Sequence, residues 1–396
     1  MFALRPPSIN LLDKTNLSLE YRHSILISVL RGLAAVQVLA AHLRAQLFPG
    51  LSTLPDPTLW YQALAFFTGF AHQAVVVFFL LSGWLVGGSL LNRLREPGIM
   101  IRYAIDRLTR LWIVLVPCFV ITLGVGAYVG TVDSGSVSFA PANEYSVTAF
   151  IGNLLGLQDM AVPRFGGNFA LWSLANETWY YVLFPLLVLT YLCKRVVSKL
   201  IAAAALVVVA SFLSFQIVLF FAIWLLGVVA SRVRINASRP VRAVLLLILV
   251  AVAVYYRFVG SNDILTTESF FQDLVFSLAF LVFLSSQQFK ADATRRSTQV
   301  AIWTGNLLAP FSFTLYVIHV PLLVLLRHIY EPLRAARLSP DRLVDLFVYG
   351  AMFAAIILLS YLLYLPFEAQ TYRVRNLLQR AAVRSSSSGK EGLAMR

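Results

Sequence analysis

Two polar residues, Arg31 and His42, lie inside the apolar stretch 24–48, which is long enough to span a bilayer as a helix. They are eleven residues apart, or about three helical turns, so both side chains project from one stripe, about 16 Å apart along the axis. A guanidinium at this depth should face protein, water or a ligand. The pair predicts an anion-binding group and an acid–base group on one helix face. The structural alternative is a polar stripe that joins this helix to its neighbours.

A carboxylate, Glu177, is expected at the same membrane depth as His42. The apolar stretch 170–192 should enter from the outer face, which places Glu177 about two turns below that face, close to the level of His42. A buried imidazole beside a carboxylate suits general acid–base chemistry. We therefore predict that His42, Arg31 and Glu177 are catalytic. Glu177 alone could instead be a protonated carboxyl bonded to a neighbouring helix.

Further polar residues lie in other apolar stretches. Tyr316 and His319 are three residues apart and share a helix face, as do Ser312 and Tyr316 at a spacing of four. Ser82 lies at mid-membrane depth beside a glycine. Taken singly, His319 could be a packed histidine and Ser82 a packing residue.

The basic stretch 93–110 includes Arg107 and Arg110. Arginines gathered at the end opposite His42 suit a phosphorylated ligand, because the planar guanidinium matches phosphate geometry. Taken alone, the stretch could be an ordinary cytoplasmic basic loop. The two ends together predict an anion clamp inside and a proton-transfer centre outside.

The composition defines the class of protein that positions these residues. The 396 residues are 59% hydrophobic and 13% charged, whereas a soluble domain would carry about twice that share of charge. We therefore expect an all-α, polytopic integral membrane protein. The net charge of +14 fits cytoplasmic loops and lipid headgroups better than nucleic acid. The two cysteines have no disulfide or metal-ligand spacing, and we expect no metal.

The apolar stretches predict about ten transmembrane helices: 24–48, 74–91, 111–129, 170–192, 200–212, 216–230, 241–256, 269–286, 301–326 and 343–366. Basic residues mark alternate loops, which places both termini in the cytoplasm. The loop 327–342 fits this pattern least well. We expect a cytoplasmic segment 1–23, a transmembrane domain 24–366, and a basic, partly disordered cytoplasmic tail 367–396.

Five segments together resemble the acyltransferase-3 family of bacterial membrane acyltransferases. They are Arg31-x10-His42, FFLLSGWL (78–85), RLTRLWIVLVP (107–117), WSLANETWYYVLFP (172–185) and FSFTLYVIHVPL (311–322). They occur in the family's order over nearly the whole chain. One departure is Phe313, where the family usually has Tyr.

The resemblance implies transfer of an acyl group, usually acetyl, from cytoplasmic acyl-CoA to a hydroxyl on the outer side. Acceptors in the family are typically sugars of lipopolysaccharide, exopolysaccharide or Nod factors, and in some members macrolides. It also implies a multi-pass protein of the bacterial inner membrane, with acyl-CoA as substrate and no permanently bound cofactor. The partners implied are a glycan or glycolipid acceptor, membrane lipids and polysaccharide-assembly proteins, but not nucleic acid.

Carried over by residue, the resemblance makes His42 the catalytic base, Arg31 a donor-binding or channel-lining residue, and Glu177 a support for the acceptor. Arg107 and Arg110 would bind the CoA phosphates. Further substrate-binding positions in the motifs are Ser82, Trp172, Ser173, Tyr316 and His319.

Two other functions remain open from sequence. In a transporter, the same buried charges would form a proton-coupled pathway. Paired broken helices in inverted repeats would favour it, and the sequence has no such pattern. An inert scaffold of a polysaccharide-assembly complex is disfavoured by the intact Arg31 and His42. Direct transfer and a covalent acyl intermediate are equally compatible with the sequence.

Overall fold

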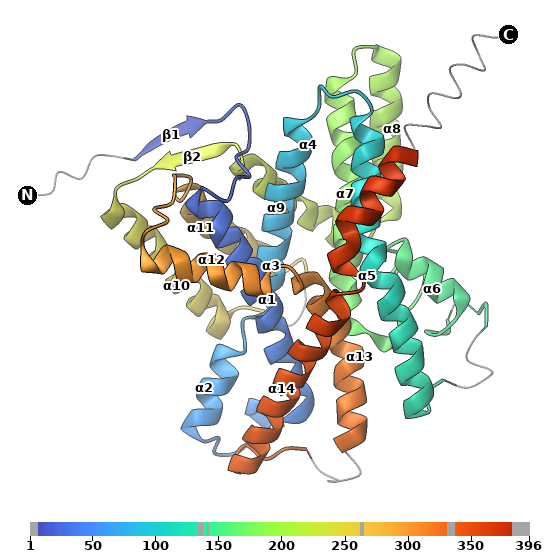
Figure 1. Ribbon diagram of the computed structural model, residues 1–396, viewed down its shortest axis with the longest axis vertical. Coiled ribbons are helices and arrows are strands. Elements are labelled where there is room, and N and C mark those ends of the chain that lie inside the picture. Colours follow the sequence, from blue (N-terminus) through green and yellow to red (C-terminus); the bar gives the residue numbers. More distant parts are fainter. Residues whose placement is uncertain (1–6, 133–137, 141, 262–264, 331–336, 382–396) are drawn as a thin grey trace, which may run out of the picture.

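The structure is a computed structural model that describes residues 7–132, 138–140, 142–261, 265–330 and 337–381. It is a helical bundle (Figure 1). The α-helices are α1 (Arg22–Leu47), α2 (Leu59–Phe67), α3 (Ala71–Ser82), α4 (Gly88–Asn92), α5 (Ile99–Val129), α6 (Val147–Leu154), α7 (Trp172–Leu192), α8 (Val196–Phe212), α9 (Phe215–Ala230), α10 (Arg239–Val259), α11 (Phe270–Ser285), α12 (Arg296–Leu308), α13 (Ser312–Tyr330) and α14 (Leu343–Tyr364). The short turns η4 (Phe169–Leu171) and η6 (Glu368–Gln370) bear on the site, and residues 371–381 are helical.

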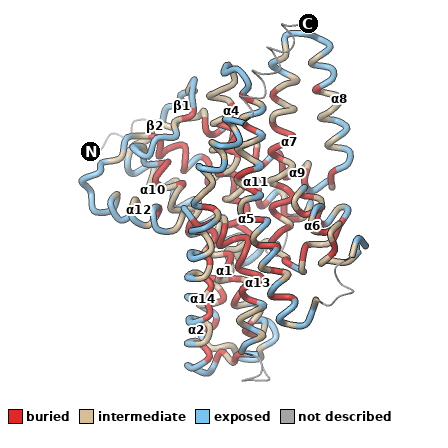
Figure 2. The backbone as a smooth tube through the Cα atoms, turned by 45° about the vertical axis from the view of Figure 1, so that its right-hand side comes forward, coloured by how far each residue is buried: buried red, intermediate tan, exposed pale blue. Residues whose placement is uncertain are grey.

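The helix α1 lies at the centre of the bundle. It packs against α3, α12, α13 and α14, while α3 also packs against α9 and α11. Figure 2 shows the buried residues concentrated along these central helices. By contrast, α10 has no buried residue and α8 has only Ala202, so both lie at the margin of the bundle. Their exposed apolar surfaces suit contact with lipid.

Within the described residues, six helical segments are long and apolar enough to cross a membrane: 22–53, 59–92, 99–129, 239–259, 312–330 and 343–381. Three shorter apolar helices, α8, α9 and α11, accompany them. These helices make a polytopic membrane protein. The count of ten spans and the placement of the termini stay predictions.

Two predicted boundaries are wrong. The helix that precedes the long loop starts at Ile99 rather than 111, so Arg102, Arg107 and Arg110 lie on α5 and not in a loop. The predicted span 301–326 is two helices, because α12 ends before Pro310 and α13 begins at Ser312. Pro310 has no N–H to donate, and its ring would clash with the carbonyl four residues earlier.

A small antiparallel sheet is the exception to the predicted all-α fold. Strand β1 (Ser8–Leu11) pairs with β2 (Val233–Asn236), with Ser8 opposite Asn236 and Leu11 opposite Val233. Just after β1, the Thr15 and Ser231 hydroxyls are 2.8 Å apart. The N-terminal segment is thereby held across the bundle, and Leu17 reaches the wall of the main cavity.

The crossing of α3 and α9 fixes the centre of the bundle. A Cβ at Gly83 would lie 2.0 Å from the Trp224 carbonyl oxygen, and one at Gly227 would lie 2.2 Å from that of Leu80. Glycine therefore allows these two backbones to touch. Directly after Ser82 the chain forms a π-helical turn, Gly83–Gly87. Such turns occur often at functional sites, and this one helps to set the position of Ser82.

Candidate active site

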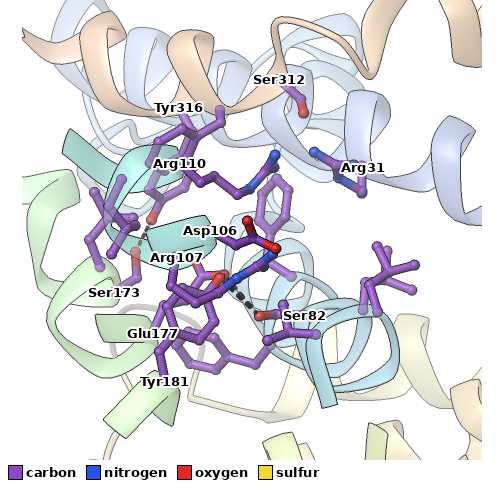
Figure 3. Close-up of a pocket in the computed structure, with 18 of the residues that line it drawn as sticks. Arg31, Ser82, Asp106, Arg107, Arg110, Ser173, Glu177, Tyr181, Ser312 and Tyr316 are labelled. Carbon is purple, nitrogen blue, oxygen red and sulfur yellow. Dashed lines mark hydrogen bonds between the residues drawn. The ribbon is translucent and has the colours of Figure 1, made fainter. Parts of the chain in front are cut away.

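A cavity of about 300 Å³ lies between α1, α3, α5, α7 and α13 (Figure 3). Its walls contain most of the residues predicted from sequence: Arg31, Ser82, Arg107, Arg110, Ser173, Glu177 and Tyr316. Trp172 is the first residue of α7, next to Ser173, but is not part of the wall. His42 and His319 also lie outside the wall, and form a separate pair beyond Tyr316.

Four guanidinium groups line this cavity. That of Arg375 lies 3.7 Å from Asp106, and the other three belong to Arg31, Arg107 and Arg110. Arg107 and Arg110 are one turn apart on α5, and Figure 3 shows Arg110 and Arg31 of α1 pointing toward each other. Among the described residues, none of the three has a carboxylate within 4.0 Å. Arg107 Nε is buried without a hydrogen-bond partner in the described part of the chain. The site therefore holds positive charge that an anionic ligand would compensate.

Aromatic rings position two of these arginines. The Arg107 guanidinium lies 5.8 Å from the centroid of the Tyr103 ring and 5.6 Å from that of Tyr181. The Arg110 guanidinium lies 5.8 Å from the Phe313 ring, at the position where the related motif usually carries Tyr. Each ring face attracts the cation and limits its movement.

Glu177 lies at the arginine end of the site. It accepts hydrogen bonds from Ser82 Oγ (2.8 Å) and from the Tyr181 hydroxyl. Trp224 Nε1 in turn donates to Ser82 Oγ (3.2 Å). The predicted pairing of Glu177 with His42 is wrong. Each makes its hydrogen bonds elsewhere, and only Glu177 lines the cavity.

The approach to α7 explains why Glu177 does not meet His42. The prediction assumed that this helix starts at the outer surface. Instead the preceding segment enters the bundle, where Asn168 is 1% exposed and donates from Nδ2 to the Val317 carbonyl oxygen of α13 (2.9 Å). Leu171 is fully buried just before the helix. Helix α7 therefore begins inside the protein, and its first turns reach the arginines.

His42 pairs with His319 instead. His42 Nδ1 and His319 Nε2 are 2.8 Å apart, and the two rings stack with centroids 5.1 Å apart. Phe169 contacts the His42 ring edge-on at 4.9 Å. The sequence spacing that joined Tyr316 and His319 gave no hint of this contact, which spans 277 positions in the chain.

The hydrogen bonds of this pair determine its neutral tautomers. His319 Nδ1 lies 2.8 Å from the Tyr316 carbonyl oxygen, which can only accept, so Nδ1 carries the proton and Nε2 is an acceptor. His42 must then donate from Nδ1, which leaves His42 Nε2 unprotonated. This nitrogen has no hydrogen-bond partner among the residues described. It is available as a general base.

Tyr316 connects the two ends of the site. Its ring lines the cavity, and its hydroxyl lies 2.5 Å from Ser173 Oγ. The Tyr316 and His319 rings are one turn apart on α13, with centroids at 6.1 Å. The arginine cavity and the histidine pair are therefore neighbours, separated by one aromatic side chain.

Sequence reasoning missed several residues of the site. Tyr181 follows Glu177 by four positions, a helical spacing that could have identified it. Glu368, beyond the last predicted span, is 8% exposed and accepts hydrogen bonds from the backbone N–H (3.0 Å) and hydroxyl (2.7 Å) of Thr314. Arg375 lines the cavity and lies 3.7 Å from Asp106, which also lines it. No local pattern marks Glu368 or Arg375.

The described residues contain no group of three or more His, Cys, Asp or Glu side chains placed to hold a metal ion. The site is instead built from guanidinium, imidazole, carboxylate and hydroxyl groups.

Comparison with known proteins assigns the chain to a family. Residues 25–365 match the model of the acyltransferase 3 family, described as an acyltransferase domain. Searches of curated proteins and of solved structures found no significant match. The matched residues include the histidine pair and, from the cavity, Arg31, Arg107 and Arg110. The chain therefore belongs to the acyltransferase 3 family and is a membrane acyltransferase.

Proposed function

We propose that this protein is an O-acetyltransferase of the bacterial inner membrane. It moves an acetyl group from cytoplasmic acetyl-CoA to a sugar hydroxyl of an exopolysaccharide, a lipopolysaccharide or a similar glycan on the outer side. The observation that carries the proposal is the unprotonated His42 Nε2 beside a cavity whose wall includes the guanidinium groups of Arg31, Arg107 and Arg110, unpaired among the described residues. Together they supply a base for a hydroxyl and a site for an anionic donor.

The donor binds through its phosphates at the arginine end. Arg31, Arg107 and Arg110 have no carboxylate partner within 4.0 Å in the described residues, so phosphate oxygens would complete their hydrogen bonds. The cavity volume of about 300 Å³ is at the small end for ligand sites. It suits the acetyl-pantetheine arm, with the nucleotide at the mouth near Asp106, Thr371 and Arg375.

The transfer step uses His42. The acceptor hydroxyl gives its proton to His42 Nε2 as its oxygen attacks the thioester carbonyl carbon. The new C–O bond forms, the C–S bond breaks, and the thiolate of CoA leaves. His319 holds His42 in the required tautomer through the Nδ1 hydrogen bond. The proton then passes from His42 to the thiolate or to solvent, which restores the base.

The test separates chemistry from donor binding. We expect His42→Ala to abolish O-acetylation of the cell-surface glycan, while purified protein in nanodiscs still binds acetyl-CoA with nearly unchanged affinity. Arg107→Gln should weaken acetyl-CoA binding by about ten- to a hundredfold, because it removes a charge-assisted hydrogen bond. His328→Ala is the matched control, since His328 contacts Tyr128 near the end of α13, away from the cavity.

Near-normal acetylation in the His42→Ala strain would contradict the catalytic role of this imidazole. A folded wild-type protein that binds no acetyl-CoA would contradict the donor site and favour the transporter alternative.

A further inference from the structure

A second groove, of about 840 Å³, lies at the C-terminal end of α1, away from the arginine cavity. It is lined by Arg44, Ala45, Phe48, Gly50, Leu51, Ser52, Pro57, Gln62, Ala65, Arg257 and Arg337. Arg44 follows Arg31 by thirteen residues, so the groove is about 20 Å away from that residue along the helix axis. The proposed transfer reaction does not use it.

The groove contains cationic groups from three separate parts of the chain. Arg44 belongs to the last turn of α1, Arg257 to the last turn of α10, and Arg337 to the segment before α14. Its described lining includes no Asp or Glu. Neither Arg44 nor Arg337 has a carboxylate within 4.0 Å in the part of the chain that the structure describes. An anion would complete the hydrogen bonds of the Arg44 and Arg337 guanidinium groups.

The C-terminal end of α2 fixes two of the guanidinium groups. Arg44 Nε donates to Thr68 Oγ1 (2.9 Å), and Arg257 Nη2 donates to the Ala65 carbonyl oxygen (3.1 Å). The Arg257 guanidinium also lies directly against Gly69, where an added Cβ would be 2.0 Å from Nε. The Arg44 bond uses one donor nitrogen, so its two Nη groups remain for a ligand in the groove.

The backbone beside the third arginine, Arg337, is held in place by a hydrogen bond. Arg337 itself is exposed, but the next residue, Leu338, is 2% exposed and donates its N–H to the Leu47 carbonyl oxygen (2.9 Å). This bond ties the segment to the end of α1, next to Arg44. Hydrogen bonds within the protein therefore hold Arg44, Arg257 and the backbone beside Arg337 in place before any ligand binds.

The location of the groove indicates which anion it meets. Arg44 and Arg257 lie in the last turns of apolar helices, at the level of lipid headgroups rather than hydrocarbon. One wall includes Arg257 of α10, a helix without buried residues that lies at the margin of the bundle (Figure 1), so we expect the groove to face lipid. Leu51, which is 36% exposed, adds apolar surface beside the arginines.

We propose that this groove binds the phosphate group of a membrane lipid, with Arg44, Arg257 and Arg337 as its ligands and the acyl chains lying along α10. The planar guanidinium groups match phosphate oxygens, and the exposed apolar face of α10 accommodates the chains. The proposal does not depend on the transfer reaction, and its test measures binding alone.

The experiment titrates purified full-length protein in detergent with dioctanoyl phosphatidic acid and counts bound lipid by native mass spectrometry. We expect the wild type to bind this lipid, and to bind neither dioctanoylglycerol, which lacks the phosphate, nor inorganic phosphate with comparable affinity. Arg44→Gln and Arg337→Gln should each weaken binding about tenfold or more, since each removes a charge-assisted contact. Arg164→Gln is the matched control, because Arg164 pairs with Asp159 outside the groove.

Gly69→Ala provides a variant that keeps every charge. Its Cβ must displace the Arg257 guanidinium, so binding should weaken although the net charge is unchanged. The unfolding temperature of each variant shows whether it is folded.

Equal lipid binding by the wild type and by the folded groove variants would overturn the proposal. The arginines would then have only the structural role of binding the C-terminal end of α2. An equal loss in Arg164→Gln would overturn it in favour of general surface charge. Equal binding of inorganic phosphate would overturn the assignment to a lipid.

Discussion

At the scale of residues, the histidine pair determines what chemistry the site can perform. His319 Nδ1 is committed to the Tyr316 carbonyl, so its Nε2 accepts from His42 and leaves His42 Nε2 as the base. In this arrangement His319 acts through His42 rather than on the substrate. It is a positioning residue, and its replacement should affect turnover more than donor binding.

This role predicts a difference between two substitutions. A Gln side chain at position 319 can still accept from His42 Nδ1, whereas Ala cannot. We expect His319→Ala to lower kcat by about a hundredfold, which is within the rate enhancement that one general acid–base group provides. His319→Gln should retain more activity. The KM for acetyl-CoA should change little in either variant. Equal losses in both, or a loss confined to KM, would contradict the positioning role.

At the scale of elements, close helix contact holds the site together. The backbones of α3 and α9 meet at Gly83 and Gly227, directly beside Ser82, which holds Glu177. The short turn η6 contributes in another way, because its Glu368 binds the first-turn N–H of Thr314 in α13. That contact satisfies a helix N-terminus next to the cavity residues Ser312 and Phe313.

The helix crossing predicts a strong effect of Gly227→Ala. Its Cβ would lie 2.2 Å from the Leu80 carbonyl oxygen, and backbone cannot yield as a side chain does. We expect the free energy of unfolding to fall by about 1–3 kcal/mol, the usual cost of overpacking a core. The measurement is the unfolding temperature in detergent. Gly124→Ala on α5 is the control, because nothing lies within 4 Å of its added Cβ. If both variants unfold at the same temperature as the wild type, the close crossing is not required.

At the scale of the whole molecule, the two sites lie at different levels along α1, one at Arg31 in its N-terminal half and one at Arg44 in its last turn. The wall of the arginine cavity includes Leu17, from the segment after β1, and Arg375, from the last helical residues 371–381. The wall of the second groove includes Gln62 and Ala65 of α2, a helix at the lower end of the view in Figure 1. The distribution of basic loops predicts that the arginine cavity lies toward the cytoplasm and the groove toward the outer side.

Labelling with an impermeant thiol reagent tests this orientation. In a background without Cys118 and Cys193, Asp56→Cys should be labelled in intact cells, while Thr294→Cys should be labelled only after the membrane is opened. Both positions are exposed, one in the loop before α2 and the other between α11 and α12. Labelling of Thr294→Cys alone in intact cells would reverse the orientation, and with it the side on which acetyl-CoA must enter.

The sequence by itself determined the class of protein, the family, and most of the residues that meet in the cavity. Long apolar stretches must form helices in lipid, because no water is present to satisfy the backbone, so their existence is a local property. The polar residues inside them, such as Arg31 and Glu177, must face the protein interior for the same reason. Such residues therefore gather in one place even when their partners cannot be foreseen.

Only the tertiary structure decided which of these residues pair. The depth argument joined His42 to Glu177 because it treated every span as starting at the membrane surface. Asn168 shows why this fails, since its bond to Val317 draws the start of α7 into the bundle. The pairing of His42 with His319, the cap from Glu368 and the groove of Arg44 and Arg257 all depend on helix rotation and on contacts between distant segments. Those contacts are set by packing across the whole bundle, and no local spacing in the chain encodes them.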